Sequence, residues 1–192
     1  MIVLDIGSHN GQTLAELVKP IYTFSAIHAF EPMPNEYTAL RLTYGQLPPL
    51  HLHNYGLADF TGPAPVYGSN SICEASMYAT KVDVDSTVVT QCNFMQASVF
   101  FAGLPDEPLV VKMNCEGAEV PILTDLAESG QLGRIAHLTV DFDIRRVAGH
   151  EADAEPVIDA LNSAGIEWRI SGEHFHGDTH QAKIANWLRE VL

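Results

Sequence analysis

The sequence predicts an α/β protein built on a doubly wound, mostly parallel, Rossmann-like sheet. Short apolar runs alternate with helix-like segments along most of the chain, which is typical of parallel strands joined by crossover helices. A glycine-bearing turn follows the first apolar run, at the edge where such sheets bind ligands. Of the 192 residues, 46% are hydrophobic, which is enough for a sizeable core.

The first 56 residues show the alternation most clearly. Pro20 ends the first helix-like run, and Pro32 breaks the second strand-like run, because proline continues neither element well. The ranges expected here are strand 2–6, turn 7–11, helix 11–19, strand 25–31, helix 34–45 and strand 50–56.

The rest of the chain resumes the alternation after an irregular stretch. Residues 59–80 are rich in Gly, Pro, Ser and Asn, so we expect a long loop, and long loops in compact domains tend to be functional. The later expected elements are strand 81–90, helix 93–102, strand 108–114, helix 118–129, strand 135–143, helix 151–164, strand 166–171 and helix 180–191. With no linker-like segment in sight, residues 1–192 are expected to form one domain.

Composition narrows the class of function. The 24 acidic and 10 basic residues give a net charge of −14, which disfavours nucleic-acid and anionic membrane partners and fits a small-molecule substrate. No apolar run approaches the ~18 residues of a membrane span, and no secretory signal is visible. Cys73, Cys92 and Cys115 have no C-x-x-C spacing and suggest reduced thiols, so we expect a cytoplasmic protein.

The turn after the first strand reads D-I-G-S-H-N-G. Gly7 would let the backbone approach a ligand, and Gly11 would let the helix start close to the strand. A dinucleotide turn has G-x-G-x-x-G, whereas here an acid, Asp5, precedes the first glycine. That acid would repel a pyrophosphate but suits an amino group or a sulfonium, which indicates S-adenosylmethionine.

The second expected strand ends in H-A-F-E-P and adds a second acid at the same sheet edge. A carboxylate there, Glu31, can accept hydrogen bonds from both hydroxyls of a ribose. The alternative is an ordinary surface acid before a turn. Together with the first motif, Glu31 favours binding of an adenosyl ligand.

At this point the sequence resembles the FkbM-type family of class I S-adenosylmethionine-dependent methyltransferases. The resemblance lies in V-L-D-I-G-S-H-N-G-Q-T, A-F-E-P-M-P-N, N-Y-G-L-A-D-F-T-G and V-V-K-M-N-C-E-G-A-E-V-P-I-L, and it covers roughly residues 2–145. The family usually has K-I-D-x-E-G-A-E where this chain has K-M-N-C-E-G-A-E. The resemblance implies a class I methyltransferase fold and transfer of a methyl group to an oxygen of a small molecule or sugar.

The resemblance also implies roles for particular residues. Asp5, Gly7 and Gly11, with Ser8 and His9 in the same turn, would surround the methionine part of the cofactor. Glu31 would hold the ribose, Pro32 beside it would also bind the cofactor, and Ala58 and Asp59 would lie near the adenine. Lys112, Asn114 and Glu116 would mark the active edge, with Asn114 touching the cofactor as well.

Two departures from the family pattern leave alternatives open. Asn114 stands where the family commonly has Asp, and it keeps the acceptor oxygen but loses the charge. The chain begins on its first strand, so we expect a fold truncated at the N-terminus. The cofactor is then covered by the 59–80 loop (Ser69–Ser71) or by another subunit, or the site is open, and the edge left exposed suggests a homodimer. An S-adenosylmethionine-binding protein that needs a partner for activity is the alternative function.

The catalytic candidates are Glu116, Asn114 and Asp141. Glu116 and Asn114 would orient the acceptor or the methionine, although Glu116 could simply be an early-helix acid favoured by the helix dipole. Asp141 and Asp143 alternate onto one face of their strand, so one of them acts as general base or both are solvated.

Lys112 and Cys115 flank these candidates. Lys112 lies in an apolar strand and needs a partner, for which Glu119 or Asp141 is available. Cys115 lacks a base placed by the sequence, so we interpret it as a small buried residue.

A histidine-rich stretch, G-E-H-F-H-G-D-T-H, precedes the last helix. His174, His176 and His180 have a spacing that could ligate a metal, which would suit a metal-dependent hydrolase. The other interpretations are a polar loop capped by Asp178 or Thr179, or a single histidine that acts as a base. We expect no metal.

Overall fold

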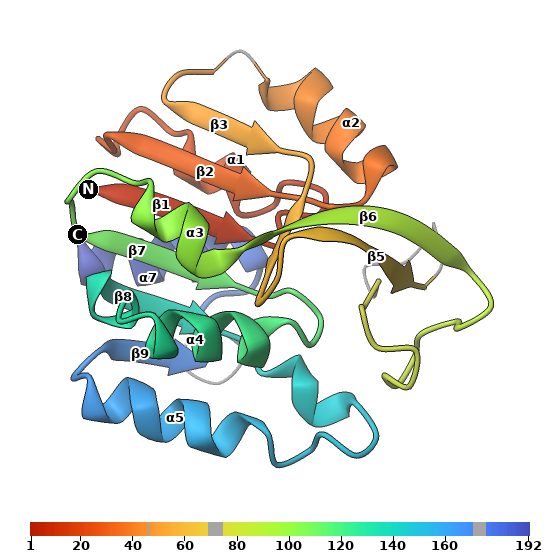
Figure 1. The fold of residues 1–192 in the computed structure, drawn as a ribbon. Coiled ribbons are helices and arrows are strands. Elements are labelled where there is room, and N and C mark those ends of the chain that lie inside the picture. The colour runs from red at the N-terminus through yellow and green to blue at the C-terminus, as the bar shows by residue number, and fades with distance from the viewer. Residues whose placement is uncertain (46, 69–74, 171–175) are drawn as a thin grey trace.

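The computed structural model describes residues 1–45, 47–68, 75–170 and 176–192. Its centre is a six-stranded sheet in the order β3-β2-β1-β7-β8-β9, in which every neighbouring pair is parallel (Figure 1). These strands are β1 (Ile2–Ile6), β2 (Ala26–Phe30), β3 (Leu50–His53), β7 (Leu109–Met113), β8 (Ile135–Val140) and β9 (Glu167–Ile170). The chain winds outward from β1 to β3 and then from β7 to β9, so the strand order reverses between β1 and β7.

Helices cover both faces of this sheet. In Figure 1, α3, α4 and α5 lie in front of the sheet and α7 lies behind it. The bounds are α1 (Leu14–Leu17), α2 (Pro34–Tyr44), α3 (Ala97–Ala102), α4 (Glu119–Glu128), α5 (Ala154–Ser163) and α7 (His180–Val191), with short 3-10 turns η1 (Leu132–Arg134) and η2 (Asp143–Arg146).

Alternation along β1 explains the two layers. Leu4 and Ile6 belong to the core shared with α4 and α5, whereas Val3 packs in a second core with Trp187 and Leu188 of α7. All five residues of β1 are buried, as expected for a central parallel strand covered on both faces.

A second, three-stranded sheet stands beside the carboxyl end of the first. Its order is β4-β6-β5, from β4 (Gly56–Ala58), β5 (Gly62–Tyr67) and β6 (Val89–Gln96), and Figure 1 shows β5 and β6 reaching away from the central sheet. Pro63 and Pro65 fit in β5 because it is an edge strand of this sheet, where proline is tolerated. Its neighbour in the sheet is β6, and a bridge between Tyr67 and Ser76 lies beyond the two prolines.

The middle of the chain is where the element prediction was wrong. Part of the expected loop 59–80 is β5, and residues 69–74 of this stretch, which include Ser69–Ser71, lie outside the described residues. The strand expected over 81–90 begins only at Val89, and the helix expected over 93–102 begins only at Ala97. Cys92 and Phe94 are buried while their neighbours Gln91 and Asn93 are exposed, so residues 89–96 alternate as a strand.

Two element ends also differ from the prediction. The helix expected over 11–19 is confined to the four residues of α1. The strand expected over 135–143 ends at Val140, and Asp143 begins η2, so Asp141 and Asp143 do not continue one strand face. The other expected strands and helices are confirmed within three residues at each end.

A stack of histidines joins the edge strand β3 to the cavity-forming end of β2. His28 stacks on His51 and His53, with ring centroids 4.9 and 5.3 Å apart, and His53 stacks on Phe30 at 4.7 Å. His28 Nδ1 lies 3.0 Å from His53 Nε2, and Tyr55 Oη lies 3.0 Å from His53 Nδ1. Burial, together with the neighbouring imidazoles, lowers the pKa of both His28 and His53 to about 4.

The stack should make stability depend on pH. A base whose pKa is lowered by folding binds more protons when unfolded, so its stabilising effect is complete above pH 6.5 and is lost as pH falls toward 4. As pH falls over this range, we expect the free energy of unfolding to decrease more steeply for wild type than for His28→Phe. The two slopes should differ by up to about 1.4 kcal/mol per pH unit, because the variant lacks one protonation site. Urea unfolding followed by circular dichroism at several pH values measures it.

The comparison with the variant matters because Glu31 and Glu119 act in the opposite direction. Burial raises the pKa of each to about 7, so both stabilise the fold as pH falls, equally in the two proteins. His176→Gln, at an exposed histidine, is the control and should keep the wild-type slope. Equal slopes for wild type and His28→Phe would contradict the conclusion that the buried His28 makes stability depend on pH.

Candidate active site

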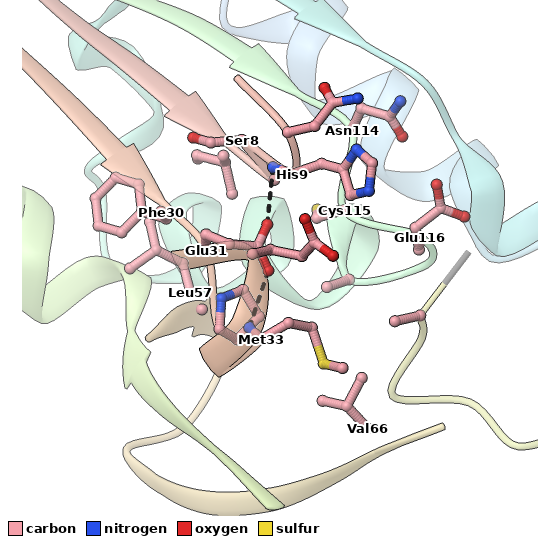
Figure 2. A pocket seen from close by; sticks show the side chains of 18 of the residues that line it. Ser8, His9, Phe30, Glu31, Met33, Leu57, Val66, Asn114, Cys115 and Glu116 are labelled. Atoms are coloured by element: carbon pink, nitrogen blue, oxygen red, sulfur yellow. Dashed lines mark hydrogen bonds between the residues drawn. The ribbon is translucent and has the colours of Figure 1, made fainter. Parts of the chain in front are cut away.

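A cavity of about 210 Å³ opens at the carboxyl ends of β1, β2 and β7, beside the point where the strand order reverses. This is the ligand-binding position of open α/β sheets. Figure 2 shows Glu31 near its centre, with Asn114, Cys115 and Glu116 across from it and Met33 and Val66 on another side.

The turn after β1 is held against the end of β7 by Gly7. Its φ is +83°, and a Cβ built there would lie 1.9 Å from the carbonyl oxygen of Asn114. Gly11 has a similar backbone (φ +82°), and its Cβ would lie 2.7 Å from Tyr44, a residue of α2. Both glycines are therefore needed for contacts within the protein, and Gly11 lies outside the cavity lining.

Glu31 is fixed in the cavity wall by two backbone donors. The amide of His9 donates to Oε2 at 2.8 Å and the amide of Met33 donates to Oε1 at 2.9 Å, as the dashed lines in Figure 2 show. Burial raises the pKa of Glu31 to about 7, against the effect of these amides. Each carboxylate oxygen can accept a further hydrogen bond, so the fixed group can still receive a ligand.

Asp5 and Lys112 form an ion pair beneath the cavity. They are register partners on β1 and β7, with Lys112 Nζ 3.0 Å from Asp5 Oδ1, and Nζ also donates to the Gly7 carbonyl at 2.7 Å. The prediction that Glu119 or Asp141 is the partner of Lys112 was therefore wrong. Lys112 lines the cavity whereas Asp5 does not, so the lysine stands between the acid and the space above it.

Glu116 lies in the turn from β7 to α4 and faces the cavity. Its φ of +58° is a conformation that non-glycine residues rarely adopt, and such strain tends to gather at functional sites. Lys81 Nζ lies 2.6 Å from Glu116 Oε2, and Ser76 Oγ donates to the Glu116 carbonyl at 2.6 Å. Burial raises the pKa of Glu116 despite this lysine.

The structure brings together part of the predicted site. Eight residues predicted for the cofactor site or the active edge line the cavity: Gly7, Ser8, His9, Glu31, Pro32, Lys112, Asn114 and Glu116. Five lie outside the lining: Asp5, Gly11, Ala58, Asp59 and Asp141. Cys115 also lines the cavity, and burial together with Glu119 raises the pKa of its thiol, which disfavours a thiolate nucleophile.

Among the candidate metal ligands, His180 lines the cavity, and its Nε2 lies 3.0 Å from Thr13 Oγ1. His176 is exposed, and His174 lies outside the described residues. Within the described ranges, no group of three or more His, Cys, Asp or Glu side chains could hold a metal ion. In the same ranges, no helix is long and apolar enough to cross a membrane.

The apolar wall of the cavity was missed by the sequence prediction. It is contributed largely by the second sheet and its connections: Leu57, Val66, Ala75, Met77 and Phe94. Leu57 lies in the quoted motif N-Y-G-L-A-D-F-T-G but was not singled out, and the other four were missed because their segments were expected to be a loop or a helix. Lys81 was likewise missed as a site residue, because it was predicted to begin a strand.

Comparison with solved structures finds a similar fold in the crystal structure of methyltransferase FkbM from Methylobacillus flagellatus KT. The TM-score is 0.52 at 16% sequence identity, over 86% of this chain and 37% of that chain. This chain thus spans little more than a third of the length of that protein. No protein-family model and no curated protein matches the sequence. The likeness confirms the predicted α/β, Rossmann-like fold.

Substitution of Gly7 tests the contact that shapes the site. We expect Gly7→Ala to lower the free energy of unfolding by about 3 kcal/mol or more. A Cβ would overlap the carbonyl oxygen of Asn114, and alanine would be strained at the positive φ of this position. Gly133→Ala is the control, since nothing lies within 4 Å of its Cβ position, and it should change stability by less than about 1 kcal/mol. Equal stability of the two variants, measured by urea unfolding, would show that the contact is dispensable.

Proposed function

We propose that this protein is an S-adenosylmethionine-dependent methyltransferase that methylates a hydroxyl of a small molecule or sugar. The observation that carries the proposal is Glu31, a fixed carboxylate with spare acceptor capacity in a cavity at the strand-order reversal. A diol such as the ribose of the cofactor is the ligand group that such a carboxylate suits best. The fold likeness to methyltransferase FkbM and the sequence motifs support the same proposal.

The residues of the cavity suit the cofactor. Glu31 would accept hydrogen bonds from the ribose hydroxyls. The apolar side chains Leu57 and Phe94, beside Pro32, would pack against the adenine. The Oδ1 atom of Asn114 is buried and has no hydrogen-bond partner among the described residues, so a donor on the ligand would satisfy it. When bound, the cofactor would supply an activated methyl group on a sulfonium.

Glu116 would serve the acceptor side of the cavity. Its carboxylate is held by Lys81 and could orient an acceptor hydroxyl or take its proton. Asp141, which lies outside the cavity lining, is the weaker candidate for a base. Holding two reactants in line contributes ~7–11 kcal/mol to lowering such barriers, so positioning by the cavity outweighs any single base.

Calorimetry with S-adenosylmethionine tests the proposal directly. We expect Glu31→Ala to weaken binding by about 100-fold, because hydrogen bonds to a charged group are lost. Ribose hydroxyls need the ionised carboxylate, so wild-type affinity should fall as pH drops below 7, approaching tenfold per pH unit, and this dependence should be absent in Glu31→Ala.

Glu128→Ala, which removes an exposed acid at the end of α4, is the charge-matched control and should bind like wild type. No binding by wild type would refute the proposal. Binding without consumption of the cofactor, across a screen of hydroxyl acceptors with and without co-expressed partners, would favour a cofactor-binding protein that needs a partner for activity.

A further inference from the structure

Two side chains that line the cavity at the junction of β1 and β7 have hydrogen-bonding capacity that the described residues do not use. The carboxylate oxygens of Asp5 also lack a hydrogen-bond partner among these residues, but they lie beneath the cavity lining, with Oδ1 in an ion pair with Lys112. The ammonium of Lys112 has three N–H donors, of which one meets the Gly7 carbonyl and another faces Asp5. The Oδ1 atom of Asn114, two residues along, is buried and without a hydrogen-bond partner in the described part of the chain. Both residues line the cavity, so one donor and one acceptor face the same space.

Two hydroxyls that line this corner of the cavity, those of Ser8 and Thr13, already have partners. Ser8 Oγ donates to the Asp5 carbonyl at 3.0 Å, and Thr13 Oγ1 lies 3.0 Å from His180 Nε2. Lys112 and Asn114 therefore line the cavity at this corner with capacity left for a ligand, whereas the unpartnered oxygens of Asp5 lie outside the lining.

We propose that Lys112 and Asn114 are the specificity residues for a zwitterionic α-amino acid group, with Lys112 binding its carboxylate and Asn114 accepting from its ammonium. The proposal rests on the proposed function, in which that group is the methionine end of the cofactor. It differs from the sequence-based expectation that Asp5 holds the amino group, since Asp5 is turned to Lys112 and lies outside the lining.

Charge balance explains why the residue that accepts a hydrogen bond from the ammonium, Asn114, is an amide. Asp5 is fully buried and Lys112 is 6% exposed, so their charges cancel in a poorly solvated place. A zwitterion adds no net charge to that pair. An aspartate in place of Asn114 would leave an excess negative charge there, whereas the amide accepts the ammonium hydrogen bond and keeps the sum at zero.

The test compares three ligands: S-adenosylmethionine, its decarboxylated form, which keeps the amine and the sulfonium, and 5′-methylthioadenosine, a neutral thioether that lacks the whole amino acid group and the sulfonium charge. Wild type should bind S-adenosylmethionine about 10- to 100-fold more tightly than the decarboxylated form, because a hydrogen bond to a charged group is lost. Lys112→Met should bring this ratio close to one and leave the affinity for 5′-methylthioadenosine unchanged.

Asn114→Leu tests the proposed contact between Asn114 and the ammonium. It should weaken binding of S-adenosylmethionine and of its decarboxylated form by about 5- to 20-fold each, since both carry the amine, and leave 5′-methylthioadenosine unchanged. Lys183→Met, which removes a lysine of α7 outside the cavity lining, is the charge-matched control and should keep all three wild-type affinities.

The outcomes separate this inference from the proposed function. Wild type that binds none of the three ligands refutes the proposed function itself. Wild type that binds all three, with a ratio unaffected by Lys112→Met, or with 5′-methylthioadenosine weakened equally, overturns the role of Lys112. Should Lys112→Met fail to fold, the double variant Asp5→Asn/Lys112→Met keeps the buried charge balanced and gives the same comparison.

Discussion

The close approach of the β1 turn to the end of β7 is the constraint on which the site depends. It requires glycine at position 7, since any side chain there would occupy the place of the Asn114 carbonyl. The same turn is tied to the other side, because the amides of Gly7 and Ser8 both donate to the Phe30 carbonyl at the end of β2. One turn thus fixes Lys112 and Asn114 on its one flank and Glu31 on its other.

The sequence predicted the central sheet well because its strands are buried on both faces and its turns carry glycine or proline. Glu31 and the turn after β1 were found because parallel strands bring their carboxyl ends to one edge. The second sheet was not predicted, since β5 contains two prolines that are tolerated only at an edge, and edge position is a tertiary property. The Asp5–Lys112 pair was missed for a similar reason: register between strands 107 residues apart cannot be read from spacing.

Charge is distributed unevenly between the surface and the site. The chain carries a net charge of −14, yet within the described residues its two buried lysines, Lys81 and Lys112, each meet an acid at or beneath the cavity. Each pair is poorly solvated, and removing one partner alone would leave a buried charge uncompensated, which is costly. The site is therefore organised by local pairing, despite the net negative charge of the chain.

The cavity has walls from two sheets that share no strand pairing in the described part of the chain. Its polar side belongs to the central sheet, whose ladder of hydrogen bonds fixes every position, and its apolar side belongs to β4, β5 and β6. Side chains such as Val66 and Phe94 can therefore change in size without altering the register of β1, β2 or β7. The positions of the polar groups in the cavity are thus set independently of the size of the side chains that shape its apolar wall.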